Sequence, residues 1–514
     1  MTIKQMSLGE FSNLAQHSQN LVVYREIMAD QLTPIGVVAQ LQAEMHEGTL
    51  LESGLQQTED SRYSYIAFGL MAQLSARGQQ ITRRVGACIT HLSADPFSVV
   101  RQLLEELNCD NPPHELLRMQ GAVGFMTYDA VRSQENIPDR HPNEQDLPDL
   151  LFNFYHTTLV FDHVQHKLLL AKRVELGADV HQVYQEAQVY LQNLVDKISC
   201  VVPNVARNIL PHQGDPSSQA PQDDMGERAR QDDVDESTPQ VDISDTDFMH
   251  LIGQAKHYIS LGDAFQIVLS RCFKQSYTAT PLDIYRALRK VSPAPYMFYF
   301  PMEHGVMVGA SPEKLITVRQ GKVEINPIAG TRARSTAADE EKNASELLAD
   351  DKELAEHMML VDLARNDLGA VCKPGTVGVK TLLQVKHFSH VSHLTSVVAG
   401  QLAADKDALD ALQATFPAGT VSGAPKIRAM EVIDALETSK RGLYGGAFCR
   451  VDELGNLDSC IAIRMAILRD GVATIRTGAG IVADSNPESE AAETRQKARG
   501  MLAAIALAEE GLAC

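Results

Sequence analysis

The sequence predicts an α+β fold in which large antiparallel β-sheets carry helices on their outer faces. Short runs of β-branched and aromatic residues recur along the chain, and several of them are joined in pairs by short turns. Longer segments with amphipathic spacing lie among these runs. This mixture favours α+β over a doubly wound sheet. With 514 residues, of which 44% are hydrophobic, the chain is long enough for two or three domains with sizeable cores.

A polar segment divides the chain into two regions. Residues 203–240 are polar, rich in Pro and almost without aromatic or β-branched residues, which predicts a flexible linker. The linker separates an N-terminal region, 1–202, from a C-terminal region, 241–514.

The elements of both regions follow from the spacing of their apolar residues. In the N-terminal region, strands are expected over 64–76, 153–162 and 166–174, and helices over 97–107 and 183–198. The C-terminal region has more strands and three long helices. Its strands are expected over 265–273, 296–300, 305–310, 391–400, 461–470 and 472–483, and its helices over 337–364, 424–438 and 488–510.

The charge balance limits the partners. The formal net charge of −20 argues against nucleic acid or an anionic membrane as the main partner. An anionic substrate must therefore meet a local basic pocket.

Two features predict a cytoplasmic protein. The N-terminus has no apolar signal region, and no stretch approaches the ~18–20 apolar residues of a membrane span. The eight cysteines are scattered without a C-x-x-C pair, so we expect reduced, mostly buried thiols.

Two helical segments each carry glutamates three residues apart. Glu353 and Glu356 lie in one, and Glu490 and Glu493 in the other. Residues i and i+3 share a helix face, so each segment presents a ridge of two carboxylates. Four carboxylates brought together would repel one another unless a divalent cation lay among them, and an oxygen-only site suits Mg²⁺. The simpler interpretation, which is commoner for such glutamates taken alone, is solvated helix acids, with Glu493 paired to Lys497 at i+4.

Three histidines recur at every third residue, at 387, 390 and 393. They would suit a soft metal only on a helix, but the run V-S-H-L-T-S-V-V alternates like a strand and places His390 and His393 on opposite faces. A zinc site is therefore improbable, and a lone strand histidine is more often structural than catalytic.

Read together, the C-terminal motifs resemble a known family. In chain order they are GDAFQIVLSR, PAPYMFYF, GASPEKL, PIAGTRAR, AEHMMLVDLARND, VSHLTSVVAG, FPAGTVSGAPKIRAMEVI, YGGA, AIR, TGAGIVADS and ESEAAETRQKA. They are similar to the chorismate-utilising enzymes, and among these to the anthranilate synthase component I family, over 241–510 and more weakly in the N-terminal region. The resemblance implies the fold of that family, with 241–514 as the chorismate-binding catalytic domain and 1–202 as a regulatory region.

The resemblance also implies a reaction. An Mg²⁺-dependent lyase of tryptophan biosynthesis would add ammonia to C2 of chorismate with loss of the C4 hydroxyl, and would then eliminate pyruvate to leave anthranilate. Glu356 and Glu493 would bind the metal directly, and Glu353 and Glu490 would hold its waters.

The substrate contacts are likewise implied by the resemblance. Arg464 would grip the enolpyruvyl carboxylate and Lys497 would answer the remaining negative charge. The other substrate-binding residues would cradle a carboxylate with their backbone or side chains. They are Gly330, Thr331, Tyr444, Gly478, Ala479 and Gly480.

Catalytic roles fall on three residues by resemblance. Glu313 would protonate the leaving C4 hydroxyl, which requires a carboxyl group that burial keeps protonated near neutral pH. His393 would take the C2 proton in the elimination. Gln266 stands where isochorismate and salicylate synthases carry a water-activating lysine, and a neutral amide suits ammonia.

Two alternatives remain beside anthranilate synthase. Aminodeoxychorismate synthase component I typically carries a nucleophilic lysine in its PIKGT motif, where this chain has Ala329. A non-catalytic regulatory paralogue would lack a catalytic group, and none is missing.

Two further partners are implied by the resemblance. The motif TLLESG resembles the tryptophan-sensing element of the family, although an ordinary strand end followed by a turn is the simpler interpretation. The residues concerned are Glu52, Ser53, Pro295, Tyr296 and Met297. The chain has no Cys-His glutaminase signature, so a separate glutamine amidotransferase subunit, component II, would supply the ammonia.

Overall fold

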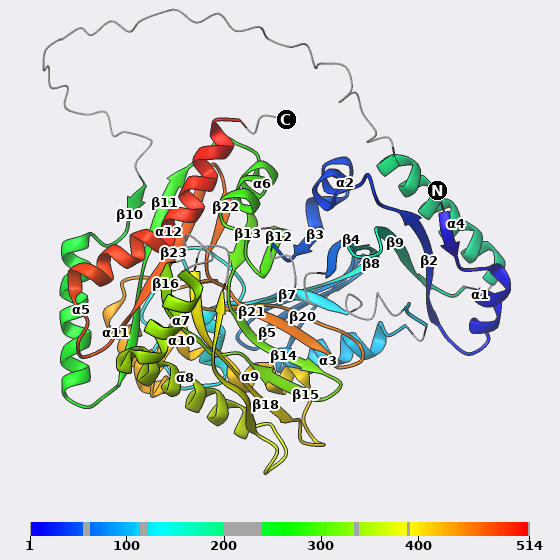
Figure 1. Cartoon of the computed structure of the whole chain (residues 1–514). Helices are drawn as coiled ribbons and strands as arrows, with labels where there is room; N and C mark the ends of the chain where they lie inside the picture. Colours follow the sequence, from blue (N-terminus) through cyan, green and yellow to red (C-terminus); the bar gives the residue numbers. More distant parts are fainter. Residues whose placement is uncertain are drawn as a thin grey trace, which may run out of the picture.

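The computed structural model describes residues 2–54, 62–109, 111–113, 121–177, 179–199, 239–303, 305–333, 339–387 and 391–511. Nearly all of the predicted linker therefore lies outside the described residues. The predicted α+β class is confirmed, because every strand pair is antiparallel and helices cover the sheets (Figure 1).

The strands form two arms that share two long strands. In the first arm, hydrogen-bonded neighbours follow one another as β1 (Thr2–Gln5), β2 (Asn20–Met28), β9 (Lys167–Glu175), β8 (Leu150–Asp162), β4 (Tyr63–Arg77), β3 (Thr49–Glu52), β12 (Tyr296–Met302), β13 (Gly305–Ser311), β22 (Met465–Arg469), β23 (Val472–Ile481) and β11 (Gln266–Ser276). The short strands β10 (Gln240–Val241) and β19 (Gly423–Ala424) pair with the two ends of β11.

The second arm also contains β4 and β8. Its members are β6 (Cys88–Ser93), β5 (Gln80–Val85), β4, β8, β7 (Ala122–Met126), β20 (Ala447–Val451), β21 (Leu457–Ile461), β14 (Lys314–Arg319), β15 (Lys322–Ile325) and β18 (Val391–Gln401), with β16 (Ile328–Ala333) and β17 (Gly378–His387) also paired to β18. β4 and β8 serve both arms because each is long enough to offer different halves to different neighbours.

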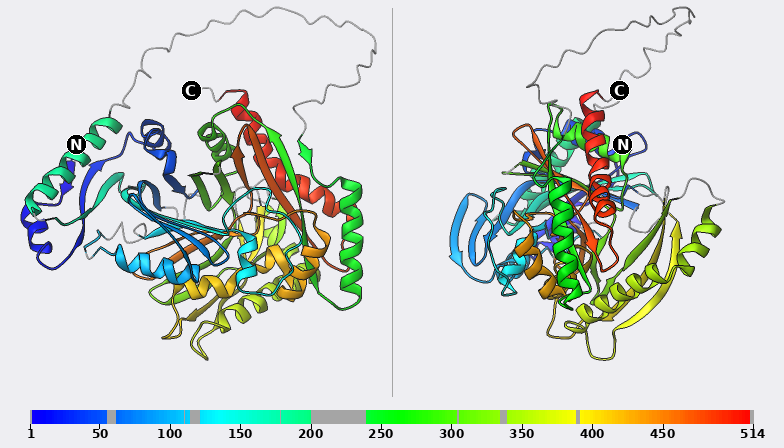
Figure 2. Two further views of the ribbon diagram at one scale, coloured as in Figure 1. Left: turned by 180° about the vertical axis from the view of Figure 1, so that it is seen from behind. Right: turned by 90° about the vertical axis from the view of Figure 1, so that its left-hand side faces the viewer.

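Helices pack on the outer faces of both arms. They are α1 (Leu8–Leu14), α2 (Pro34–Gln40), α3 (Pro96–Glu106), α4 (Val180–Ser199), α5 (Asp245–Ser260), α6 (Pro281–Val291), α7 (Asp339–Ala349), α8 (Asp351–Gly369), α9 (Ala408–Thr415), α10 (Gly419–Ser422), α11 (Lys426–Leu436) and α12 (Pro487–Glu509). α12, red in Figure 1, lies along β23 and contacts α5 and α6. α8 lies beside β16 and β18 near one edge of the molecule, as Figure 2 shows from two further sides.

The two regions of the chain share hydrophobic cores. Phe125 of β7 packs edge-on against Phe300 of β12, with 6.2 Å between ring centroids. β7 also pairs with β20 of the C-terminal region, where Phe125 is the register partner of Phe448. Because such contacts join residues far apart in the chain, the N-terminal region is a structural part of the body that holds the C-terminal motifs.

Most predicted elements are present, but two are interrupted. The helix expected over 337–364 is two helices, because Asp350 accepts hydrogen bonds from the backbone N–H groups of Lys352 and Glu353 and caps α8. The strand expected over 461–470 breaks after Ile461, and Arg464 adopts a left-handed φ of 53°.

The thiol prediction holds where the structure describes the cysteines. All six of these are free thiols, and Cys88 alone among them is exposed. None of the helices within the described ranges is long and apolar enough to cross a membrane.

Candidate active site

The structure brings the two glutamate ridges together. Glu356 of α8 lies close enough to Glu493 of α12 for the two carboxylates to repel each other. Burial first, then the charge of Glu353, and to a smaller extent that of Glu493, raise the pKa of Glu356. Burial and the charge of Glu493 also raise the pKa of Glu490, against a lowering contribution from Ser485. The two glutamates on each helix share one face, and the two helices together form one acidic surface. Glu356 and Glu493 in this surface are 137 positions apart in the sequence.

Polar neighbours hold each ridge. The Arg332 guanidinium donates to Glu353 at 3.1 Å, and the Gln266 amide donates to Glu356 at 3.5 Å. Lys497 pairs with Glu493 at 2.6 Å, the i+4 ion pair that the sequence allows. Glu493 is therefore partly neutralised by a direct ion pair, whereas Glu356 has a weak amide donor, like charges and only the opposing charge of Lys352.

The carboxylates fit a cation that keeps much of its water. No three His, Cys, Asp or Glu side chains in the part of the chain that the structure describes lie close enough to enclose a metal ion. The ridges nevertheless offer only oxygen ligands, and their mutual repulsion would be relieved by a divalent cation. Few protein ligands and several waters are typical of Mg²⁺.

Two glycines of β23 form a narrow wall beside the ridges. A Cβ atom on Gly478 would lie 2.5 Å from the Tyr444 hydroxyl oxygen and 2.6 Å from the Leu269 carbonyl oxygen. A Cβ atom on Gly480 would lie 2.8 Å from the Gln266 amide nitrogen. Glycine is required at Gly478 because any side chain would displace backbone or the buried tyrosine. Ala479 between them is fully buried in a hydrophobic cluster.

Two cations border this wall. The Lys497 ammonium donates to the Gly478 carbonyl oxygen at 2.9 Å. The Arg464 guanidinium donates to the backbone carbonyl of Lys497 at 3.4 Å, and burial lowers the pKa of Arg464. Arginine stays charged in proteins, so a partly desolvated cation lies beside Tyr444, whose pKa burial raises to about 12. Two cations, as an anionic substrate would need, therefore lie together beside the wall in a strongly acidic chain.

Glu313 directly precedes β14. Burial raises its pKa to about 7, against opposing contributions from the Thr420 hydroxyl and Lys497. Glu313 lines a cavity of about 50 Å³ together with Thr420, Asn326 and Asp367. Its backbone carbonyl accepts from the Ile461 N–H at 3.0 Å, which fixes the turn. A carboxyl group with this pKa is about half protonated at neutral pH and can donate a proton.

His393 lies on β18, as the alternation predicts. Its Nδ1 lies 2.9 Å from the Gly330 carbonyl oxygen, so Nδ1 carries the proton and Nε2 is the basic nitrogen. Burial lowers the pKa of His393, which keeps the ring neutral near pH 7. Gly330 has a φ of 65° and lies in β16. The next residue, Thr331, is the register partner of His393.

Two contributors were missed by sequence reasoning. Arg332 belongs to the quoted PIAGTRAR motif, and its contact with Glu353 was not anticipated. His357 follows Glu356 in α8, is fully buried, and its Nε2 lies 2.7 Å from the Ser396 hydroxyl of β18. The motif offered a signal for Arg332, whereas nothing in the sequence near His357 indicates a partner 39 residues away.

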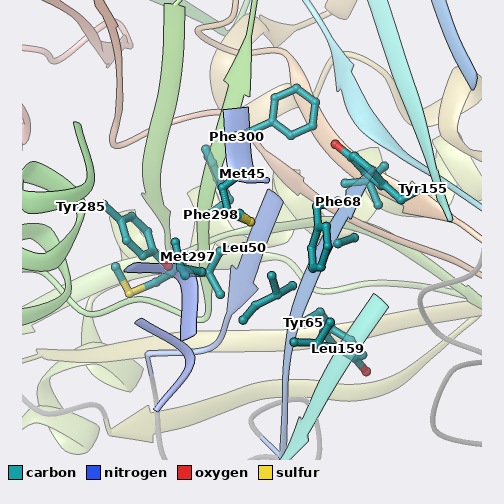
Figure 3. Close-up of a cluster of buried hydrophobic side chains, with 14 of the residues drawn as sticks. Met45, Leu50, Tyr65, Phe68, Tyr155, Leu159, Tyr285, Met297, Phe298 and Phe300 are labelled. Atoms are coloured by element: carbon teal, nitrogen blue, oxygen red, sulfur yellow. The ribbon is translucent and has the colours of Figure 1, made fainter. Parts of the chain in front are cut away.

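The five residues assigned to effector binding gather at a second place, on β3 and β12. Met297 is the register partner of Glu52. Glu52 accepts from the Tyr285 hydroxyl at 2.9 Å and pairs with Arg289 at 3.0 Å, while burial raises the pKa of Glu52. Ser53 directly follows β3, and Figure 3 shows Met297 and Tyr285 beside Leu50 in the surrounding hydrophobic cluster. Pro295 precedes β12, and the Tyr296 hydroxyl donates to Asp458 at 3.0 Å.

Comparisons with known proteins show the family of this chain. Residues 50–503 match the model of a chorismate binding enzyme family. The chain is 38% identical over 506 residues to anthranilate synthase component 1 of Acetivibrio thermocellus, covering 98% of this chain and 99% of the relative. It is 40% identical over 512 residues to the same component of Bacillus caldotenax, covering 98% and 97%.

Solved structures show the same fold. Anthranilate synthase component I from Streptococcus pneumoniae superimposes with a TM-score of 0.71 at 32% identity, over 93% of this chain and 99% of that chain. The menaquinone-specific isochorismate synthase from Escherichia coli gives a TM-score of 0.66 at 19% identity, over 96% and 98%, which shows a shared fold alone.

Proposed function

We propose that this chain, which belongs to the chorismate-binding enzyme family, is the large subunit of an anthranilate synthase in tryptophan biosynthesis. It would convert chorismate and ammonia to anthranilate and pyruvate. The observation that carries the proposal is that two carboxylate ridges meet beside a glycine wall that Arg464 and Lys497 border. Lys497 also acts on the Glu313 carboxyl, whose pKa is about 7, and His393 contacts Gly330, which lies beside Glu353.

The residues of the wall would bind the substrate dianion. Arg464 would hold one carboxylate, and Lys497 would offset charge at the other. Mg²⁺, when bound to Glu356 and Glu493 and through water to Glu353 and Glu490, would neutralise charge and orient the ring. Tyr444, Gly330, Thr331, and the backbone of Gly478 through Gly480 would limit the substrate to one pose.

The first half-reaction would use Glu313 and Gln266. Glu313 would give its proton to the departing C4 hydroxyl as ammonia attacks C2. Gln266, with its amide held near Glu356, would face the ammonia without supplying an amine of its own. In the second half-reaction, Nε2 of His393 would remove the C2 proton while pyruvate leaves, because the carbonyl of Gly330 keeps the proton on Nδ1.

Aminodeoxychorismate synthase component I is the second candidate function. The fold and the two carboxylate ridges suit both reactions. Ala329 supplies no nucleophilic amine at the position where that enzyme typically carries lysine, and this favours anthranilate synthase.

The decisive test uses the purified chain alone with chorismate and Mg²⁺. With ammonium at raised pH it should form fluorescent anthranilate, because free ammonia then becomes available, although deprotonation of Glu313 will limit the rate at the highest pH. With glutamine in place of ammonium it should form none, because no glutaminase motif is present. Adding a glutamine amidotransferase subunit should restore glutamine use.

Each other outcome is informative. Glutamine-driven turnover by the single chain would disprove the need for a partner subunit. Formation of 4-amino-4-deoxychorismate would favour the second candidate, and no conversion of chorismate with either nitrogen source would favour the non-catalytic paralogue.

We also propose that tryptophan binds at β3 and β12 and inhibits the enzyme. The buried Glu52, held by Tyr285 and Arg289, anchors the strand end from which Ser53 follows. If the effector and chorismate sites are distinct, linkage requires chorismate to weaken tryptophan binding by the same factor.

Ser53→Phe is expected to relieve tryptophan inhibition while leaving uninhibited turnover close to that of the parent. The larger side chain would fill the effector pocket. Dose–response curves for tryptophan measure the effect, and Ser53→Ala, which removes the hydroxyl without adding bulk, is the control for space filling. Unchanged inhibition in Ser53→Phe would place the effector elsewhere.

A further inference from the structure

Arg271 is a fully buried cation in the middle of β11, and its role is not explained by the substrate contacts described above. Its guanidinium lies 4.9 Å from the ring centroid of Phe248 and 5.3 Å from that of Phe273. It pairs with Asp245 at 2.7 Å and donates to the Ile243 carbonyl at 3.1 Å. Burying a charge this completely is costly unless every donor has a partner.

Two further donors of the guanidinium reach α12 next to the two glutamates of its ridge. Nη2 donates to the backbone carbonyl of Ala491 at 3.0 Å, and Nε donates to the Thr494 hydroxyl at 2.9 Å. Ala491 directly follows Glu490, and Thr494 directly follows Glu493. The Arg271 guanidinium therefore binds one side of this turn of α12, and the carboxylates of Glu490 and Glu493 on the other side face α8.

A second contact links the same turn to the glycine wall. The Thr477 hydroxyl donates to the Thr494 carbonyl at 2.8 Å, and Thr477 is both the register partner of Arg271 and the residue before Gly478. The Thr494 hydroxyl also donates to the Ala491 carbonyl at 2.8 Å. β11, β23 and the first turns of α12 are therefore fixed to one another by a single buried network.

We propose that Arg271 is a positioning residue: by holding Ala491 and Thr494 it sets the place of Glu490 and Glu493, and thereby the affinity of the site for Mg²⁺. This inference rests on the proposed function. Arginine suits the task because its planar fork offers five donors in fixed directions, whereas the three donors of lysine lie on one atom. Partners that orient metal ligands commonly change metal affinity about 10–100-fold when removed.

The test compares three variants of the full chain by isothermal titration with Mg²⁺, with thermal unfolding measured in parallel. Arg271→Lys keeps the charge and loses the fork. Thr494→Val keeps the side-chain volume and removes the hydroxyl that accepts from Arg271. It replaces Arg271→Lys as the test if that variant folds poorly. Arg173→Lys is the matched control, because Arg173 lies on β9 in the N-terminal region, its side chain is only 8% exposed, and it pairs with Glu453, away from the ridges.

Arg271→Lys should raise the Kd for Mg²⁺ about 10-fold or more, and Thr494→Val should raise it by a smaller factor. The two site variants should turn over more slowly at low Mg²⁺, and saturating Mg²⁺ should restore most of the lost turnover. Arg173→Lys should lower the unfolding temperature with an unchanged Kd. An unchanged Kd in both site variants, beside a lowered unfolding temperature, would reduce Arg271 to a structural ion pair.

The role of Arg271 and the proposed function predict different outcomes when either is wrong. A parent chain that makes anthranilate and binds Mg²⁺, with variants that bind it equally well, overturns only the role of Arg271. A parent chain that binds no Mg²⁺ overturns the metal assignment in the proposed function and the role of Arg271 with it.

Discussion

Glu356→Gln and Glu493→Gln are each expected to lower anthranilate formation by at least about 10²-fold and to remove its dependence on Mg²⁺. Each substitution replaces a proposed carboxylate ligand by a neutral amide of the same shape. The fold should stay intact, since neither residue lies in a hydrophobic core cluster. The rate is measured by anthranilate fluorescence across a series of Mg²⁺ concentrations, and Glu488→Gln on the first turn of the same helix is the matched control.

The same substitution at Glu356 should raise the thermal stability of the metal-free chain. Burial and the charge of Glu353 raise the pKa of Glu356, so its ionised form opposes folding, and this cost grows as the pH rises through the folded pKa. Glutamine removes the cost. Near-normal activity in either variant would show that the paired helices are not the metal site.

His393→Ala and His393→Met are expected to separate the two half-reactions. Amination depends on Glu313 and the ammonia side of Gln266, whereas elimination needs a base at the C2 proton. The variants should still consume chorismate and accumulate 2-amino-2-deoxyisochorismate, while anthranilate formation falls by at least about 10²-fold, the usual cost of losing a positioned base.

Product chromatography under ammonium and Mg²⁺ measures both compounds. His387→Ala is the control, because His387 contacts Ser392 on the strand that carries His393 and lacks the proposed role. If His393 is structural, both half-reactions should slow together and no intermediate should appear. Anthranilate formation close to the parental rate would also exclude His393 as the base.

Several features of the fold could be predicted because they depend on neighbours in sequence. The 3.6-residue spacing predicted a helix over 488–510, close to the observed α12, and strict alternation predicted β18 rather than a histidine-bearing helix. The two misjudged boundaries depend on single residues. Asp350 caps one helix, and Arg464 turns out of one strand, where apolar spacing alone continued across both.

The candidate site could be predicted only as a list of residues. The glutamate pairs and the ordered motifs named its members, but the i+3 rule applies within one helix and says nothing of whether α8 meets α12. The contact of Gln266 with Glu356 spans 90 positions, and that of His393 with Gly330 spans 63. Helix and strand periodicities do not reach that far.

The sequence by itself determined the α+β class, most of the elements and the residues that resemble one enzyme family, because these follow from local spacing and residue type. Only the tertiary structure decided that β4 and β8 join two arms, that the two ridges face each other and that Arg271 grips the turn between Glu490 and Glu493. It also decided the protonation of Glu313, because desolvation is a property of what surrounds a carboxyl group in space.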